Sequence, residues 1–178
     1  MRIVSGIYRG RTLLEFKGNS IRPTSDMVRE SLFNIIQFKI NGKDFLDLFC
    51  GTGAVGIEAM SRGANHVTFN DFSRESITLV KKNLEKIGAT DGFDITMRDG
   101  AEFYRFSSQK YHFVFIDPPY ASDLGERALA NVSELLTDDG VAVFENEKPF
   151  TATIDGLKKV DERKYGRVYL TFFEKENY

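Results

Sequence analysis

Cysteine and histidine are scarce in this chain of 178 residues, which contains one cysteine, Cys50, and two histidines. A single cysteine cannot form a disulfide within the chain. So few Cys and His side chains also argue against a zinc or iron–sulfur site. We therefore expect no bound metal, and a reducing cytoplasm is the expected location.

Long hydrophobic runs are also missing. No apolar segment approaches the roughly 20 residues that cross a bilayer, and residues 1–6 do not have the pattern of a signal peptide. Hydrophobic residues make up 42% of the chain and charged residues 28%, which is usual for soluble globular proteins. The length fits one domain with its own core. We expect a soluble, single-domain protein.

The charge is unevenly distributed, although the net charge is only −2. Residues 1–43 contain eight Lys/Arg and three Asp/Glu, a net charge of +5, so the remainder carries −7. This asymmetry favours a basic arm on an acidic body, and hence an anionic partner such as nucleic acid. An ordinary solvated surface is the alternative.

Hydrophobic periodicity predicts a short arm followed by alternating strands and helices. Residues 1–21 are predicted as a basic β-hairpin arm, residues 22–43 as a leading helix capped by Thr24 or Ser25, and residues 44–178 as the main body. In that body we expect strands at residues 45–49, 66–69, 93–97, 111–116 and 141–144, and helices at 57–62, 75–86, 101–106 and 124–136. Two further extended stretches, 157–160 and 168–173, are joined through Tyr165-Gly166.

This alternation predicts an α/β fold, with a seven-stranded and mostly parallel sheet covered by helices on both faces. No long helix separates the last two strands, so they should form an antiparallel hairpin at the edge of the sheet. Phe103 and Phe106 are predicted to lie in the core. His66 and His112 are interpreted as packed or strand-end residues rather than catalytic ones.

A glycine-rich turn follows the first strand of the body. Gly51 and Gly53 allow the backbone to turn sharply and approach a ligand, and open α/β sheets bind ligands at the carboxyl ends of their strands. The spacing Gly51-x-Gly53-x-x-Gly56, with Asp71 twenty residues after Gly51, also satisfies a dinucleotide-binding pattern. The turn alone therefore leaves two classes of cofactor open.

Three acids, Asp47, Asp71 and Asp99, follow three successive predicted strands. A carboxylate at Asp47 would repel a pyrophosphate, but it suits a cationic ligand such as S-adenosylmethionine. We expect Asp71 to accept hydrogen bonds from ribose hydroxyls and Asp99 to meet the adenine amino group, although capping is the ordinary role for an acid such as Asp99. The predicted cofactor-binding residues are Asp47, Phe49, Gly51, Thr52, Gly53, Asp71, Asp99 and Gly100.

The segment Asp117-Pro118-Pro119-Tyr120 directly follows an apolar run. Two consecutive prolines cannot donate to a sheet ladder, so the strand must end there. A carboxylate and a prolyl carbonyl can accept the two N–H bonds of a planar amine, while an aromatic ring stacks on its face. These four residues are the predicted catalytic set of an enzyme that methylates the amino group of a base.

With these residues in place, the chain resembles class I S-adenosylmethionine-dependent methyltransferases. It resembles more closely the bacterial enzymes that methylate the N2 amino group of a guanine in 16S ribosomal RNA. The resemblance is carried by residues 2–6, 10–11, 22–26, 29–34, 47–53, 61–64, 83–84, 117–120 and 165–166. It implies a Rossmann-like class I fold, S-adenosylmethionine as cofactor and 16S rRNA as partner. Cys50 and Asn70 depart from the residues usual at their positions.

The predicted phosphate contacts are Arg9, Arg11, Arg22 and Arg29. A surface salt bridge is the alternative for each arginine alone, and for Arg29 the partner would be Asp26 or Glu30. Arg22 and Arg29 are also candidates for bracing the helix against the site.

Two other functions stay open at this point. One is amino-group methylation of another substrate, such as DNA adenine or cytosine or a protein glutamine. The other is a nicotinamide-dependent dehydrogenase, which explains the glycines but leaves Asp47 and the Asp-Pro-Pro-Tyr segment without a role. Nothing in the sequence requires more than a monomer.

Overall fold

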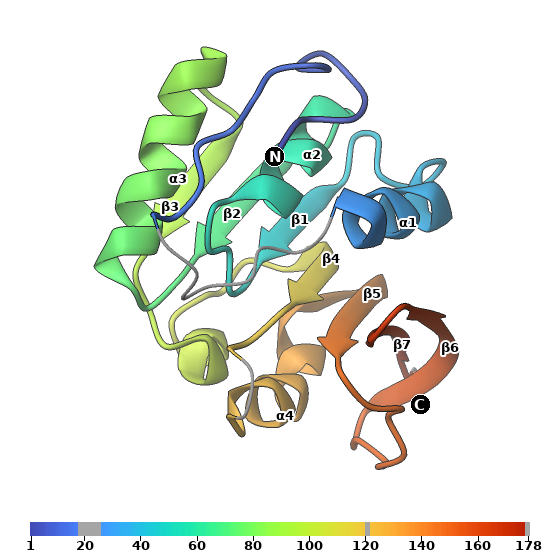
Figure 1. Ribbon diagram of the computed structural model, residues 1–178. Helices are drawn as coiled ribbons and strands as arrows, with labels where there is room; N and C mark the ends of the chain where they lie inside the picture. The colour runs from blue at the N-terminus through green and yellow to red at the C-terminus, as the bar shows by residue number, and fades with distance from the viewer. Residues whose placement is uncertain (18–25, 120–121, 177–178) are drawn as a thin grey trace.

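A seven-stranded sheet runs through the protein in a computed structural model that describes residues 1–17, 26–119 and 122–176 (Figure 1). Its strands are β1 (Asp44–Asp47), β2 (His66–Asn70), β3 (Phe93–Thr96), β4 (Tyr111–Ile116), β5 (Leu136–Asn146), β6 (Leu157–Tyr165) and β7 (Val168–Lys175). Their spatial order is β3-β2-β1-β4-β5-β7-β6. The first five strands pair in parallel, and β7 pairs antiparallel with both β5 and β6. The predicted mostly parallel sheet with an antiparallel hairpin at its edge is confirmed.

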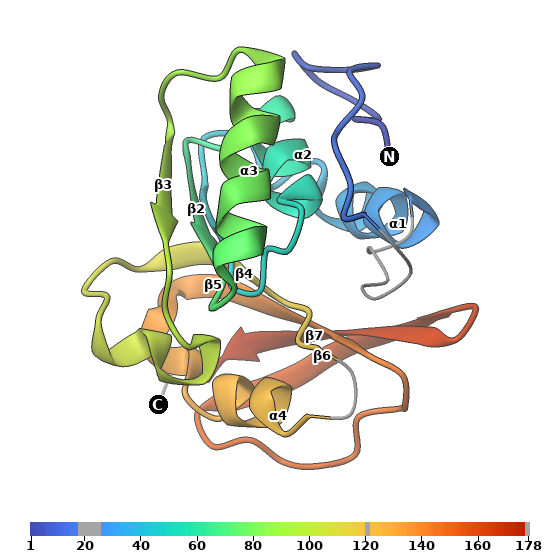
Figure 2. The same cartoon turned by 60° about the vertical axis from the view of Figure 1, so that its left-hand side comes forward.

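Helical segments cover both faces of this sheet, as Figure 2 shows. On one face lie α1 (Asp26–Ile36), α2 (Ala54–Ser61) and α3 (Arg74–Ile87); on the other lie α4 (Leu124–Leu129) and two 3₁₀ turns, η1 (Gly100–Arg105) and η2 (Val132–Leu135). Side chains alternate between the faces of a strand, so Phe45 and Phe115 pack on the first side while Leu46 and Val114 pack on the second. Each face therefore has its own apolar core.

Helix α3 shows how local sequence sets these elements. The Ser73 hydroxyl accepts a hydrogen bond from the Ser76 amide at 3.4 Å, and Gly88 ends the helix with a positive φ of 71°. The buried stripe between these caps consists of Ile77, Val80, Leu84 and Ile87. This helix begins and ends as its sequence predicts.

Helix α4 is shorter than predicted. It ends at Leu129 rather than Leu136, and a 3₁₀ turn follows. Leu136 instead pairs with Tyr111 and begins β5, five residues before the predicted start of that strand. Apolar spacing cannot separate these outcomes, because a leucine at this position serves a helix or a strand equally well.

Of the side chains assigned to packing, Phe106 differs from expectation. Phe103 is buried, but Phe106 is 59% exposed and lies beneath the Arg98 guanidinium, 4.6 Å from it. The core prediction for Phe106 is therefore wrong. His66 pairs with Asp94 at 3.0 Å, and the Nδ1 atom of His112 accepts a hydrogen bond from a backbone amide, so both histidines have structural partners.

The N-terminal arm is a minimal hairpin that lies over α2 and α3 (Figures 1 and 2). Its two limbs share one bridge, Arg2 with Thr12, and the Ile3 amide donates to the Arg11 carbonyl at 3.0 Å. The Gly10 and Leu13 amides also donate across the arm, to the Ile3 and Met1 carbonyls, whereas the amides of residues 4, 5, 7 and 8 donate to Glu58 and Ser61 of α2. The predicted hairpin is confirmed in residues 1–17, whereas the proposed caps Thr24 and Ser25 lie outside the described residues.

Candidate functional site

The carboxyl ends of β1, β2 and β3 bring three acids to one edge of the sheet. Asp47 is the last residue of β1, Asp71 directly follows β2, and Asp99 comes three residues after β3. The three strands are parallel neighbours, so their ends lie about 5 Å apart from strand to strand. All three acids line the same cavity.

Asn70, the last residue of β2, fastens these strand ends together. Its side-chain amide donates to the carbonyls of Leu48 and Arg98 at 3.0 and 3.1 Å, and its oxygen accepts from the Thr96 hydroxyl and the Arg98 amide. Asn70 is fully buried, and these four bonds use its whole hydrogen-bonding capacity. The residue that departs from the family pattern therefore sets the relative positions of the three strand ends.

The glycine turn between β1 and α2 is held by the acids themselves. Asp71 accepts a hydrogen bond from the Gly51 amide at 2.9 Å, and Asp47 accepts one from the Gly56 amide at 2.9 Å. Gly51 and Gly53 have positive φ angles of 50° and 79°, a backbone conformation that residues with a Cβ atom rarely adopt. Because each carboxylate has about four lone-pair sites, both acids keep acceptor capacity for a ligand.

Burial changes the acidity of Asp47. Removal from water raises its pKa from 3.8 to about 7, the hydrogen bond from Gly56 opposes that rise, and the negative charges of Asp117 and Asp71 add to it. The Asp47 carboxyl is therefore poised near neutral pH, where an approaching cation would favour its ionised form.

A cavity of about 740 Å³ joins this acidic edge to the proline loop after β4. Asp117, Pro118 and Pro119 line the cavity together with Asp47, Phe49, Gly51, Thr52, Asp71, Asp99 and Gly100. Of the predicted cofactor set, Gly53 does not line it but begins α2 as its N-cap. Tyr120 lies outside the described residues. The structure thus brings the proline loop and the acids to one space.

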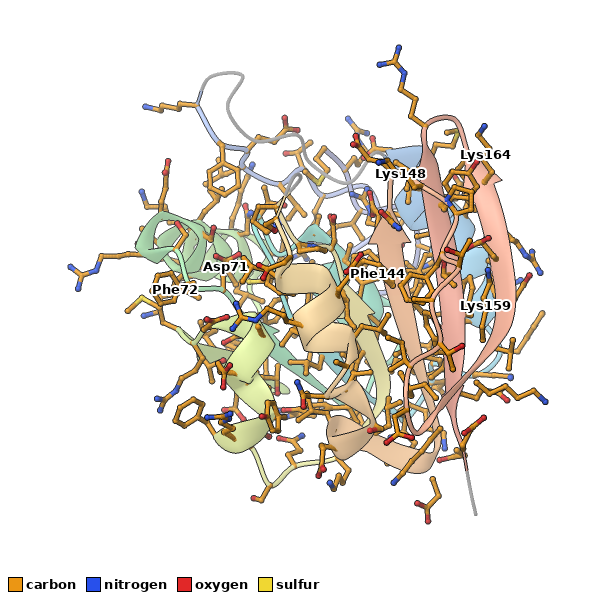
Figure 3. The ribbon with its side chains drawn as sticks, turned by 90° about the horizontal axis from the view of Figure 1, so that it is seen from below. Asp71, Phe72, Phe144, Lys148, Lys159 and Lys164 are labelled. Carbon is orange, nitrogen blue, oxygen red and sulfur yellow. The ribbon has the colours of Figure 1, made fainter. Side chains whose placement is uncertain are left out.

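Several lining residues were not predicted from the sequence. Phe72, next to Asp71, is 77% exposed at the rim (Figure 3), and Ser73 and Ser76 follow it. An aromatic residue directly after the acid at the end of a strand is a sequence signal that could have predicted Phe72 as a lining residue. Phe16 comes from the arm, and no local pattern places it near the glycine turn. Asp99 also caps η1 through the Ala101 amide, at 2.9 Å, while it lines the cavity.

The tip of the arm lies far from this cavity. The Arg11 guanidinium donates to the carbonyl of Ile87, the last residue of α3, and Tyr8 binds Ser61 at the end of α2. Helix α3 begins beside Asp71, and its 14 residues span about 20 Å. Arg9 and Arg11 are exposed, and their role as phosphate contacts stays a prediction.

Arg29 does not contact solvent. Its side chain is fully buried, donates to the Arg2 carbonyl at 2.6 Å and to Asp26 at 3.0 Å, and lies 3.7 Å from Glu58. The prediction of a phosphate contact is wrong for Arg29, and the alternative of a pair with Asp26 is correct. Arg22 lies outside the described residues.

Comparison with known proteins identifies the group to which this architecture belongs. Residues 1–174 match the sequence model of a family described as Conserved hypothetical protein 95. The chain belongs to this family. YlbH of Bacillus subtilis, provisionally named an rRNA methyltransferase, is 33% identical over 182 residues, which cover 98% of this chain and 99% of that protein.

Other members of the family carry more specific names. Ribosomal RNA small subunit methyltransferase D of Haemophilus influenzae is 33% identical over 153 residues, or 83% of this chain and 79% of that protein. A solved structure of YhhF from Escherichia coli, provisionally described as a methyltransferase, has a TM-score of 0.88 at 30% identity and covers 99% of this chain and 98% of that one. The predicted resemblance is confirmed, and the dehydrogenase alternative falls away because these named relatives are methyltransferases.

The shared fold is that of the class I methyltransferases, whose methyl donor is S-adenosylmethionine. The residues at the site fit this cofactor. Asp47 matches a cationic amino-acid group, Asp71 retains acceptors for a ribose, and the exposed ring of Phe72 offers a flat surface beside it. The cavity volume is also in the range of small-molecule sites.

Two further properties follow from the described part of the chain. None of its helices is long and apolar enough to span a membrane. Within residues 1–17, 26–119 and 122–176, no group of three or more His, Cys, Asp and Glu side chains is arranged to hold a metal ion.

Binding of S-adenosylmethionine is expected to strengthen as pH rises through about 7, because ionised Asp47 attracts a cation. Below that value the affinity should fall by up to about tenfold per pH unit, and Asp47→Asn should bind weakly with little pH dependence. Calorimetric titration between about pH 6 and about pH 8.5 measures this.

In the absence of the cofactor, the free energy of unfolding should fall as pH rises, which is opposite to the trend in cofactor affinity. The raised pKa means that protonated Asp47 stabilises the fold at low pH, and this contribution is lost as pH rises from 3.8 to about 7. An affinity for S-adenosylmethionine that stays flat between about pH 6 and about pH 8.5 in the unmodified protein would contradict the assignment of Asp47 to the cationic group.

Proposed function

We propose that this protein transfers the methyl group of S-adenosylmethionine to the exocyclic N2 amino group of a guanine in 16S rRNA. It acts in this proposal as a single-domain monomer in the cytoplasm. The observation that carries the proposal is the single cavity that holds both the strand-end acids and the Asp117-Pro118-Pro119 loop. The names of the methyltransferase D relatives support the choice of small-subunit rRNA.

The cofactor-binding part of the site consists of Asp47, Phe49, Gly51, Thr52, Gly53, Asp71, Asp99 and Gly100 in this proposal. Gly100 packs against the Phe49 ring so closely that a Cβ there would lie 2.5 Å from it, so the pair forms one wall. Asp71 binds the ribose, and Asp99 faces the adenine.

The base-binding part of the site is the loop after β4. Asp117 and the Pro118 carbonyl accept the two N–H bonds of guanine N2, and Tyr120 stacks on the base. The lone pair of N2 is delocalised into the ring, and two acceptors favour the more tetrahedral, nucleophilic nitrogen. The chemistry that bound S-adenosylmethionine supplies is an electrophilic methyl group on a cationic sulfur.

Positioning carries most of the expected rate enhancement, because the loop fixes N2 in line with the methyl carbon. As the N–C bond forms and the C–S bond breaks, positive charge develops on N2, and the Asp117 carboxylate stabilises it. The proton then leaves N2 along its hydrogen bond to Asp117, which is half-buried and lines the cavity. A paired or stacked guanine must first swing out, at a cost of roughly a few kcal/mol.

The direct test uses labelled S-adenosylmethionine with three acceptors: small ribosomal subunits lacking the modification, free 16S rRNA, and genomic DNA. Label in N2-methylguanosine from 16S rRNA is the expected result. N6-methyladenosine, or label confined to DNA or to protein glutamine, would assign the enzyme to another amino substrate and reject the rRNA proposal.

A further inference from the structure

The β6–β7 hairpin is a basic element on an acidic body. Residues 158–169 contain five Lys/Arg and two Asp/Glu, a net charge of +3, whereas residues 44–178 as a whole carry −7. The hairpin also holds Tyr165-Gly166, a part of the family resemblance to which the site gives no role. A positive φ of 60° at Gly166 makes the two-residue turn Gly166-Arg167.

Strand register places the tip of this hairpin at the catalytic edge of the sheet. Ile116, directly before Asp117, pairs with Phe144, and Asn146 pairs with Tyr169 near the start of β7. Strands β4, β5, β7 and β6 lie side by side, so three inter-strand spacings, about 14 Å, separate β4 from β6 across the sheet. The tip therefore lies at the same edge of the sheet as the proline loop.

The basic residues of the hairpin, and Lys148 in the connection between β5 and β6, differ in their ion pairs and in their place, and Lys158 lies at the far end of the hairpin, where β6 begins. Lys159 pairs with Glu162 and Arg163 with Asp161, so those charges are neutralised locally. Lys148, Lys164 and Arg167 have no ion-pair partner among the described residues, and all three are exposed. We call these three residues the tip surface.

Figure 3 shows Lys148 and Lys164 near one end of the hairpin, with Lys159 further along β6. The Lys164 ammonium lies 5.5 Å from the centre of the ring of Tyr169, its partner across the strand pair. Asp71 and Phe72 lie across the molecule in this view, on the other side of the site. A chain bound at the tip surface would thus approach the cavity from the side opposite the cofactor loop.

We propose that the tip surface binds the phosphates of the RNA strand that flanks the target guanine, an inference that rests on the proposed function. A base that enters the cavity carries its own backbone past the rim, and three cations without ion-pair partners at the same edge of the sheet as Asp117 match the adjoining phosphates. Lysine and arginine heads without carboxylate partners suit a polyanion such as an RNA backbone.

The test compares two triple variants of equal charge change. K148Q/K164Q/R167Q removes the tip surface. K39Q/K110Q/K158Q removes three exposed lysines that lie at or beyond the amino ends of the parallel strands, away from the cavity. Methyl transfer to 16S rRNA and to small subunits is measured over a range of salt, with the melting temperature of each variant as a check on folding.

We expect the tip variant to raise KM for RNA about tenfold or more, with the loss falling mainly on KM. Three lost phosphate contacts should make the slope of log affinity against log salt shallower by about 2. The control variant should change both quantities much less, and affinity for S-adenosylmethionine should be the same in all three proteins.

An unchanged KM and salt slope in the tip variant would overturn the inference and leave the proposed function standing. Equal losses in both variants would also overturn it, because they would show a general charge effect. An unmodified enzyme that transfers no methyl group to rRNA would reject the proposed function first, and the tip surface with it.

Discussion

Asp117→Ala is expected to slow methyl transfer by about 10²–10³-fold while affinity for S-adenosylmethionine changes little. Asp117 lines the cavity at the end of β4, one strand away from Asp47, and it belongs to the loop rather than to the glycine turn. Its loss removes an acceptor and a negative charge where positive charge develops. Single-turnover transfer to rRNA and calorimetric binding of the cofactor measure the two effects separately.

Asp117→Asn separates the two contributions of this carboxylate. The amide keeps one acceptor oxygen but carries no charge, so its rate should fall between those of the unmodified enzyme and the alanine variant. The charge of Asp117 also raises the pKa of Asp47, so both substitutions should move the pH midpoint of cofactor binding to lower pH. Loss of cofactor binding in proportion to the rate would place Asp117 in the cofactor site instead.

The parts of the site that the sequence predicted are those that local pattern determines. A buried strand followed by an acid or by two prolines identifies its own end, and parallel neighbours bring such ends together. Asp47, Asp71, Asp99 and the proline loop could be found in this way. Their common cavity needed only the sheet order, which the alternation of strands and helices implies.

The parts that were missed depend on contacts between distant segments. Phe16 reaches the glycine turn because Asn83 on α3 holds Leu14 by two hydrogen bonds. The Asn83 side chain accepts from the Leu14 amide and donates to the Leu14 carbonyl. Asn83 also donates to the Thr52 carbonyl at 2.9 Å, and it is fully buried. No periodicity relates residues 14–16 to residue 83, so this connection becomes visible only in the folded chain.

The predicted phosphate contact of Arg29 is an error that helical periodicity alone could have prevented. Arg29 lies four residues before Phe33 and seven before Ile36, both buried, so it belongs to the inward face of α1. Its charge suggested a surface role. The partner that makes burial tolerable, Glu58, comes from α2, and no local pattern connects the two.

Removal of Glu58 is expected to be the most destabilising single change in the protein outside the apolar core. Its carboxylate is fully buried, accepts hydrogen bonds from the Val4 and Ser5 amides at 2.9 and 3.0 Å, and pairs with Arg62 at 2.8 Å and Arg29 at 3.7 Å. Glu58→Ala would leave Arg29 with a buried charge that only Asp26 partly compensates. We expect a loss of about 3–5 kcal/mol in the free energy of unfolding, measured by urea titration.

Two variants separate this network from an ordinary ion pair. Asp26→Ala removes the exposed partner of Arg29 and should cost about 1 kcal/mol or less, because Asp26 is 62% exposed. Glu58→Gln keeps a hydrogen-bond acceptor for the amides of the arm, so its loss in the free energy of unfolding should lie between those of Glu58→Ala and Asp26→Ala. Because the arm carries Phe16 to the cavity, Glu58→Ala should also weaken cofactor binding at temperatures where it remains folded. Equal stabilities for Glu58→Ala and Asp26→Ala would show that the buried carboxylate does not hold the arm, α1 and α2 together.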